Sequence, residues 1–174
     1  MRPVTDPDGT STVTVRGLED RDRQAVHDLL TADSVVEGTM RVPHSPFSST
    51  LTRLEPKDGV HHLVAEVAGR IVGFAEVVRS PSEARHAHVA ELNMVCTHPE
   101  FVGRGVGRTL TEVVIDLADN WLNVRRIGLV VFADNPRAIR LYEGLGFEHE
   151  GVMREFGFKR GAYVDAVVMG RIRR

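Results

Sequence analysis

The sequence contains little of what several classes of protein require. Cys96 is the only cysteine among the 174 residues, which excludes a disulfide within the chain and a metal site built from several cysteines. No apolar run approaches the roughly 20 residues of a membrane-spanning helix. The opening residues MRPVTDPDGTST also lack the apolar segment of a signal peptide. We therefore expect no membrane partner and a reducing compartment, the cytoplasm by default.

An excess of charge of one sign is missing too. The 22 Lys and Arg residues are balanced by 24 Asp and Glu residues, for a formal net charge of -2. A nucleic-acid-binding surface usually shows a strong basic excess, so we expect no nucleic-acid partner. The histidine pairs His61-His62 and His86-x-His88 lack a third ligand at a usual metal-site spacing, and we expect no metal.

The apolar content suffices for the core of one domain, because 42% of the 174 residues are hydrophobic. Residues 1–11 are rich in Pro, Asp, Thr and Gly, a composition that predicts a flexible N-terminal tail. No linker or internal repeat divides residues 12–174. We expect these residues to form a single domain.

Periodicity predicts the elements of that domain. Alternating or β-branched runs indicate strands near residues 13–15, 63–67, 71–78, 87–97, 127–133, 147–152 and 163–172. Helical spacing indicates helices over residues 19–30, over the segment whose apolar face runs from Leu110 to Trp121, and over residues 135–146. Residues 32–55 are irregular and proline-containing, typical of either a binding loop or a plain connector. The order predicts an α/β fold with a mixed sheet and helices on both faces.

The most informative segment is the glycine loop, Gly103-Arg104-Gly105-Val106-Gly107-Arg108, between a strand and a long amphipathic helix. Glycines permit a tight turn and leave backbone amides exposed at a helix N-terminus, where they can bind a pyrophosphate. The spacing matches neither G-x-x-x-x-G-K-[ST] nor G-x-G-x-x-G, which argues against those two phosphate-binding motifs. A glycine-lined turn without a ligand is the alternative.

A second motif follows, Asn135-Pro136-Arg137-Ala138-Ile139-Arg140-Leu141-Tyr142-Glu143-Gly144-Leu145-Gly146-Phe147. With the glycine loop it resembles the GNAT superfamily of N-acetyltransferases, whose motifs read Q/R-x-x-G-x-G/A and N-x-x-A-x-x-x-Y-x-x-x-G-F. The resemblance covers roughly residues 13–172. It implies a mostly antiparallel mixed sheet with flanking helices and acetyl-CoA as co-substrate. Val102 replaces the usual Gln or Arg, which we expect to weaken cofactor binding slightly at most.

The resemblance also implies residue roles. The cofactor would contact the strand residues Val95, Cys96 and Thr97, the glycine loop from Gly103 to Arg108, Asn135 and Tyr142. One strand amide would hydrogen-bond the thioester carbonyl and stabilise the oxyanion. Tyr142 would be the general acid that protonates the departing thiolate. The alternatives are a core aromatic for Tyr142, a helix cap for Asn135, and a small buried hydrophobe for Cys96.

The general base is a separate question, because an amine must lose a proton before it attacks. The strand over Leu129-Val130-Val131 offers no carboxylate, so Glu91 is our candidate for base and substrate contact. Strand alternation places it on one face with Asn93, Val95 and Thr97. The alternative is a half-exposed strand carboxylate in an ion pair. His44 and Tyr163 are further substrate-binding candidates, with a surface histidine and ordinary strand packing as the alternatives.

Three segments give a narrower resemblance, to the bacterial L-amino-acid N-acetyltransferases. They are Val42-Pro43-His44, Asp119-Asn120-Trp121-Leu122 and the segment Gly161 to Met169. We therefore predict acetyl transfer to the primary amine of a small molecule, an amino acid or a similar compound. Peptide or protein N-acetylation and a non-catalytic acyl-CoA sensor are the alternatives. Similar enzymes often form homodimers.

Overall fold

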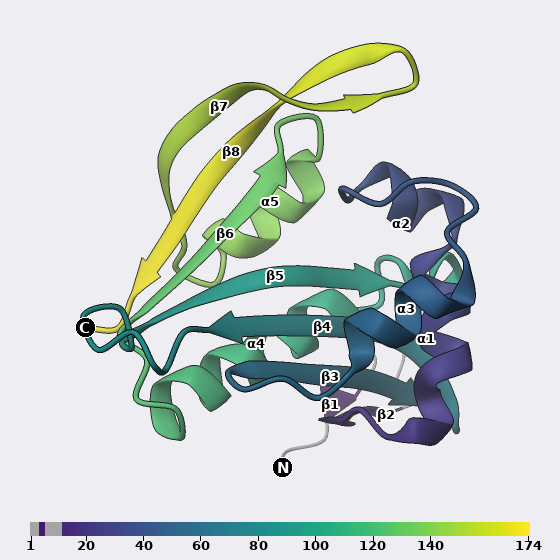
Figure 1. Ribbon diagram of the computed structural model, residues 1–174, viewed down its shortest axis with the longest axis horizontal. Coiled ribbons are helices and arrows are strands. Elements are labelled where there is room, and N and C mark those ends of the chain that lie inside the picture. The colour runs from purple at the N-terminus through teal and green to yellow at the C-terminus, as the bar shows by residue number, and fades with distance from the viewer. Residues whose placement is uncertain (1–3, 6–11) are drawn as a thin grey trace.

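The computed structural model describes residues 4–5 and 12–174, and these form an eight-stranded sheet (Figure 1). The strand order is β1-β2-β3-β4-β5-β6-β8-β7. All neighbouring strands are antiparallel except β5 and β6, as the fold prediction of a mixed, mostly antiparallel sheet requires. The strands are β1 Val4–Thr5, β2 Thr12–Gly17, β3 Val60–Val67, β4 Arg70–Arg79, β5 Val89–Thr97, β6 Arg126–Phe132, β7 Glu148–Lys159 and β8 Ala162–Ile172.

Helices cover both faces of this sheet. They are α1 Arg23–Leu30, α2 Asp33–Glu37, α3 Phe47–Leu54, α4 Val106–Asn120 and α5 Pro136–Glu143, with short 3-10 helices η1 Asp20–Asp22 and η2 Pro99–Phe101. On one face, Leu110 of α4 is buried in a cluster with Val72 and Val77 of β4. On the other, Leu29 of α1 is buried with Phe74 of β4. β4 therefore contributes side chains to two separate cores, one on each face of the sheet.

Two expectations differ from the structure. The segment 32–55, expected to be irregular, contains the two short helices α2 and α3. Neither helix contains a proline, and Pro46 is the residue before α3. Trp121, expected on the buried face of the long helix, is 77% exposed. The reason is that α4 ends at Asn120, so Trp121 lies where the helical periodicity no longer applies.

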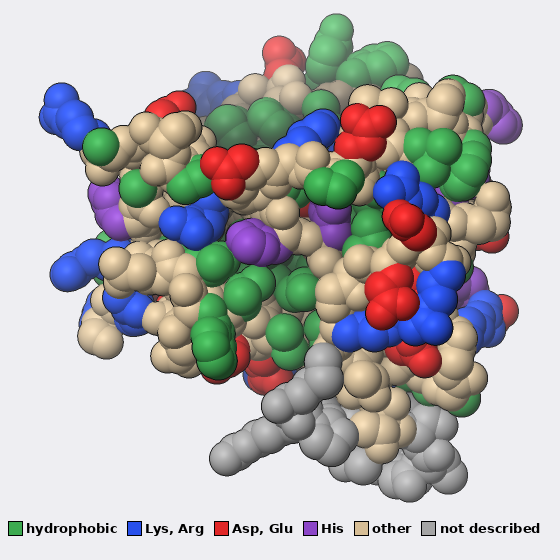
Figure 2. All heavy atoms as spheres, turned by 60° about the horizontal axis from the view of Figure 1, so that its bottom comes forward, with side chains coloured by type: hydrophobic (Ala, Val, Ile, Leu, Met, Phe, Trp, Pro, Cys, Tyr) green, Lys and Arg blue, Asp and Glu red, His purple; other side chains and the backbone are tan. Residues whose placement is uncertain are grey.

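The expected N-terminal tail lies mostly outside the described residues, which exclude 1–3 and 6–11. Within it, Val4–Thr5 forms the short edge strand β1, paired with Thr12 and Val13 of β2. None of the described helices is long and apolar enough to span a membrane. On the face shown in Figure 2, acidic and basic side chains are interspersed rather than gathered by sign.

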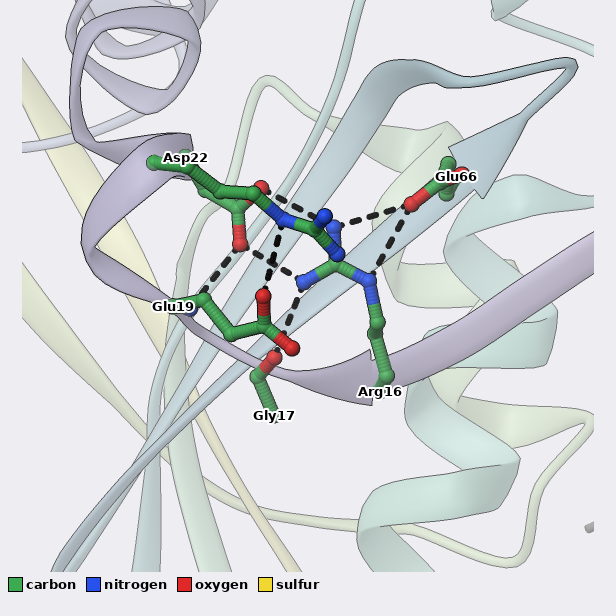
Figure 3. Close-up of polar contacts among 6 residues, drawn as sticks. Arg16, Gly17, Glu19, Asp22 and Glu66 are labelled. Atoms are coloured by element: carbon green, nitrogen blue, oxygen red, sulfur yellow. Dashed lines mark hydrogen bonds and ion pairs between the residues drawn. The ribbon is translucent and has the colours of Figure 1, made fainter.

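Arg16 of β2 ties the start of the first helical segment to the sheet (Figure 3). Its Nη1 and Nη2 atoms donate to both carboxylate oxygens of Asp22, at 2.6 and 2.9 Å, and its Nε donates to Glu66 of β3 at 3.1 Å. The hydrogen bond from Arg16 lowers the pKa of Asp22, although burial acts in the opposite direction. Asp22 also accepts from the Glu19 amide, closing a capping box before α1.

The feature that creates the site is the end of pairing between β5 and β6. Only three residue pairs join these strands, the last being Glu91 with Gly128. Directly beyond it β5 has a bulge, because Leu92 and Met94 pair with consecutive residues of β4 and Asn93 is extra. A bulge bends its strand. From there β6, β8 and β7 diverge from β5, as Figure 1 shows.

The bulge also overturns one expectation about faces. Val95 packs against the α4 core, whereas Met94 and Cys96 belong to the α1 core. Thr97 likewise faces α4, since a Cβ on Gly107 would lie 3.5 Å from its Oγ1. Glu91 precedes the bulge and pairs with Val78. The prediction that Glu91 shares a face with Val95 and Thr97 was therefore wrong, because the extra residue inverts the alternation.

Gly73 of β4 sets how closely α4 approaches the sheet. A Cβ there would lie 2.8 Å from both Leu110 Cδ1 and Val106 Cγ1 and 3.2 Å from the Cys96 carbonyl oxygen. We expect Gly73→Ala to lower the free energy of unfolding by about 1–3 kcal/mol through overpacking. Urea denaturation measures this, with Gly151→Ala as control because no atom lies within 4 Å of its added Cβ. Equal effects of both substitutions would contradict this account of the packing.

Candidate active site

Two cavities meet where β5 and β6 diverge. One, of about 400 Å³, is lined by the glycine loop and is called here the glycine-loop cavity. The other, of about 370 Å³, is lined by Glu91 and is called the Glu91 cavity. The two adjoin, because they share lining residues, namely Gly38, Thr39, Val95, Asn135, Ala138 and Tyr142. Two molecules entering from opposite sides of the sheet would therefore meet beside Tyr142.

The glycine loop leaves the N-terminus of α4 open toward its cavity. Gly103 and Gly105 have φ of 94° and 83°, values that favour glycine, and Gly105 is the residue before the helix. No side chain caps α4. The first amides of the helix, on Val106, Gly107 and Arg108, therefore face the cavity without an intrahelical acceptor. Such a terminus fits the pyrophosphate of a CoA molecule.

The arginines around this loop differ in their placement. Arg108 lines the cavity and pairs with Glu112 at 3.2 Å, whereas Arg104 lies over the Phe101 ring at 5.3 Å and does not line it. Arg137, which sequence reasoning missed, lines the cavity and has Nη2 3.6 Å from where a Gly103 Cβ would be. The available signal was its position in the first turn of α5, directly after Asn135-Pro136.

Tyr142 of α5 lies at the junction of the cavities. Its side chain is buried against Phe147, with ring centroids 5.7 Å apart, yet the residue lines both cavities. No described residue hydrogen-bonds its hydroxyl. Burial raises the pKa of Tyr142 to about 12, so the phenol stays protonated at neutral pH. A neutral phenol open to the cavity can donate a proton to a developing anion.

Asn135 performs the capping role and retains a free donor. Its side-chain oxygen accepts from the Ala138 amide at 3.1 Å, which caps α5. Its amide nitrogen has no hydrogen-bond partner among the described residues, and Asn135 lines both cavities. The cap and the expected cofactor contact therefore use different atoms and are compatible.

The strand residues Val95, Cys96 and Thr97 line the glycine-loop cavity beside Tyr142. β6 does not pair with them, so the backbone groups on that side of β5 are open to a ligand. The Cys96 thiol is buried in the α1 core, and burial raises its pKa to about 12. Cys96 is thus a small apolar residue rather than a nucleophile.

Glu91 lies over Gly128 at the last paired position. A Cβ on Gly128 would come within 2.7 and 2.8 Å of the two Glu91 carboxylate oxygens, so this glycine makes room for the carboxylate. Burial raises the pKa of Glu91, and Arg126 and His86 act against that rise. A carboxylate with a raised pKa is a better proton acceptor than an ordinary one. Gly128 had not been singled out from the sequence.

A second carboxylate, Glu76 of β4, binds two of the residues that line the Glu91 cavity, Arg53 and Asn93. It accepts from Arg53 Nη2 at 2.7 Å and Nε at 2.9 Å, from His62 Nε2 at 3.1 Å, and from Asn93. Burial alone would raise its pKa, but the bonds from His62 and Asn93 with the Arg53 charge lower it to about 2. The sequence indicates this residue as an acid within the apolar run of β4, because a buried carboxylate requires hydrogen-bonding or charged partners.

The remaining candidates are not among the residues that line the two cavities. His44 is exposed, with φ of 59°, in the connector before α3, and Tyr163 of β8 is 68% exposed against Phe158. Neither lines a cavity, and their substrate roles stay predictions. Within residues 4–5 and 12–174, no three His, Cys, Asp or Glu side chains gather as metal ligands would.

A divergent pair of strands, an open helix N-terminus and a buried tyrosine at their junction define a transferase of the CoA-binding type. The model of the acetyltransferase (GNAT) family matches residues 23–147. The chain belongs to this family and is an acetyl-CoA-dependent N-acetyltransferase.

Relatives agree with that assignment. The chain is 35% identical to the L-amino acid N-acetyltransferase AaaT of Escherichia coli K12, over 94% of this chain and 99% of the relative. It is 30% identical to phosphinothricin N-acetyltransferase of Alcaligenes faecalis, over 91% and 81%. The structure of Vibrio cholerae spermidine N-acetyltransferase with CoA and spermine superimposes with a TM-score of 0.81, at 27% identity over 92% and 95%.

The open helix terminus gives a binding prediction. A non-glycine residue at a left-handed position costs about 1–2 kcal/mol, and relaxation of Gly105→Ala would turn the α4 amides away from the cavity. We expect the Kd for CoA to rise about tenfold, or about 1.4 kcal/mol, by isothermal titration calorimetry. Gly69→Ala is the matched control, since Gly69 has φ of 80° in the β3–β4 turn. A similar loss of CoA affinity in both variants would contradict the role of the loop.

The Glu76 network gives a stability prediction. Glu76→Gln leaves Arg53 without its charge partner, so we expect a loss of about 3 kcal/mol in the free energy of unfolding at pH 7. Because folding lowers the pKa of Glu76 from 4.5 to about 2, the wild-type advantage is present above pH 4.5 and shrinks as the pH falls toward 2. Urea denaturation across pH measures it. An advantage independent of pH would contradict this, and Glu148→Gln, at an exposed pair with Arg174, should change little.

Proposed function

We propose that the enzyme transfers acetyl from acetyl-CoA to the primary amine of an amino acid or an amino-acid-like molecule. The observation that carries the proposal is the meeting of the two cavities at Tyr142 and Asn135. One cavity offers backbone amides suited to a pyrophosphate, and the other offers carboxylate and guanidinium side chains suited to a small polar molecule. The likeness to an L-amino acid N-acetyltransferase supports the acceptor class.

In this mechanism each group of the site has a separate role. The α4 amides hold the pyrophosphate, and Asn135 donates through its free amide nitrogen to the cofactor arm. An unpaired β5 amide near Val95 donates to the thioester carbonyl, which stabilises negative charge there as the amine attacks. Tyr142 donates its proton to the departing thiolate. Acetyl-CoA, when bound, supplies the activated acyl group.

Glu91 is the proposed general base. It faces the acceptor side of the sheet at the point of divergence, and its raised pKa suits the removal of a proton from an ammonium group. Gly128 beneath it fixes the space in which the carboxylate can lie. Proton removal proceeds directly or through one water, and the two routes make the same demand on Glu91.

A peptide acceptor is less well supported. The β7–β8 hairpin reaches the first helices, where Lys159 donates to the Glu37 carbonyl at 3.2 Å and Arg160 pairs with the Glu37 carboxylate. These contacts bridge the opening on one side and leave less room for an extended chain. A non-catalytic sensor is disfavoured by the open Tyr142 hydroxyl, which cofactor binding alone does not need.

We further propose that the enzyme is a homodimer and that it is located in the cytoplasm. β7 is an edge strand of twelve residues, and it and its partner β8 expose Val152, Phe158 and Tyr163. An exposed edge of this length favours pairing with a second copy of the chain, as a homodimer. We place the enzyme in the cytoplasm, a reducing compartment that suits its single free cysteine.

The test is CoA thiol release with a panel of amino acids, polyamines, aminoglycosides and short peptides. We expect turnover with amino acids, lowered at least tenfold in Tyr142→Phe while the Kd for acetyl-CoA stays within about threefold. Glu91→Gln should remove the acidic limb of the pH profile of kcat/KM, which the raised pKa places above that of an ordinary glutamate. Glu83→Gln, in the exposed loop before β5, is its control.

Turnover with peptides alone would show that the acceptor is a peptide rather than a free amino acid. Tight binding of acetyl-CoA without thiol release from any amine would contradict the proposed catalysis. Full activity in Tyr142→Phe would contradict the role of Tyr142 as the general acid, but it would not contradict acetyl transfer.

A further inference from the structure

One cation in the Glu91 cavity has no counter-ion. Arg41 lies in the connector between α2 and α3 and lines this cavity. Its Nε atom is buried and makes no hydrogen bond to any described residue. No carboxylate in the described part of the chain forms an ion pair with its guanidinium. A buried, unsatisfied donor on a charged group costs free energy that a bound anion can recover.

The surrounding charges explain why the chain itself does not satisfy Arg41. The Glu76 carboxylate is already engaged by Arg53, His62 and Asn93. Burial first, and then the charge of Arg53, lower the pKa of Arg41. Glu91, the one acidic residue among the described residues that line the cavity, lies over Gly128 of β6. The Arg41 side of the cavity is therefore electrically positive.

The rest of the cavity has both apolar and polar walls. The apolar residues include Met40, Leu92, Met94, Val130, Phe132 and Phe156, and the polar ones include Thr39, Asn93 and Asn135. A ligand that fits these walls and the charges has an amine, a carboxylate and a neutral or apolar substituent. A polyamine would bring further positive charge toward Arg41 and Arg53, where the Glu76 carboxylate is already engaged.

We propose that Arg41 binds the carboxylate of the acceptor and thereby selects amino acids over polyamines and amino-acid amides. This inference rests on the proposed function and assigns its acceptor specificity to one residue. A guanidinium donates to a carboxylate through two parallel N–H groups, which fixes the orientation of the acceptor as well as its charge. With the carboxylate held at Arg41, the amine is directed toward Glu91 and the junction at Tyr142.

The test compares L-amino acids with the corresponding amino-acid amides, which differ only at the carboxyl group. For wild type we expect kcat/KM to be about 10- to 100-fold higher for the acids, the range for a hydrogen bond to a charged group. In Arg41→Gln this preference should fall to within about threefold. The loss should appear in KM for the acid, because the contact forms on binding, and the rate with the amide should stay unchanged.

Two further variants sharpen the comparison. Arg41→Lys keeps a cation without the two-pronged geometry and should restore part of the preference. Arg125→Gln removes an exposed arginine before β6, away from both cavities, and should leave both substrates unaffected. Unchanged amide turnover in Arg41→Gln shows that the variant is folded.

Equal use of acids and amides by wild type, or an equal loss with both in Arg41→Gln, would overturn the inference and leave the acetyltransferase proposal standing. If neither acid nor amide is acetylated, calorimetric titration of the amino acid into the CoA-bound enzyme separates the two failures. If the wild type binds the amino acid and Arg41→Gln does not, the result would support the Arg41 site, although the proposed acetyl transfer would have failed. Absence of carboxylate-dependent binding would overturn both.

Discussion

Hydrogen bonding between β5 and β6 stops after Glu91 and Gly128, and the remaining features of the site depend on that interruption. The bulge at Asn93 bends β5 where the parallel pairing ends. A continuous ladder would bring β6 alongside Val95 and occupy the backbone groups that a thioester needs. The interruption instead opens the sheet at its centre, between the α4 core on one face and the α1 core on the other.

The opening separates two kinds of recognition. On the α4 side the contacts come mainly from backbone, because a pyrophosphate is held by amides at a helix terminus that Gly105 leaves uncapped. On the α3 side they come from side chains, because Arg41, Arg53, Glu91 and Asn93 line the cavity and Glu76 accepts hydrogen bonds from Arg53 and Asn93. The donor site therefore depends on backbone geometry that many sequences can supply. The acceptor site depends on particular side chains, and we expect specificity to reside there.

The parts predicted from sequence were local. The glycine loop and the Asn135–Tyr142 helix each lie within one contiguous segment, so spacing alone indicated their geometry, and the mixed sheet followed from the order of the elements. The prediction that Val95 and Thr97 share a face of β5 with Glu91 was wrong, because no residue type in the sequence indicates the bulge at Asn93. Arg41 and Gly128 were missed for a related reason. Their importance arises only when the connector before α3, β5 and β6 come together, which requires contacts distant in sequence.

A crystal structure of the enzyme with CoA and a free amino acid would test this mechanism most directly. We expect the pyrophosphate at the amides of Val106, Gly107 and Arg108, and the thiol between β5 and Tyr142. We also expect the amino acid on the opposite side of the sheet, with its amine facing the thiol. A pyrophosphate bound away from the α4 N-terminus, or both ligands on one side of the diverging strands, would contradict it.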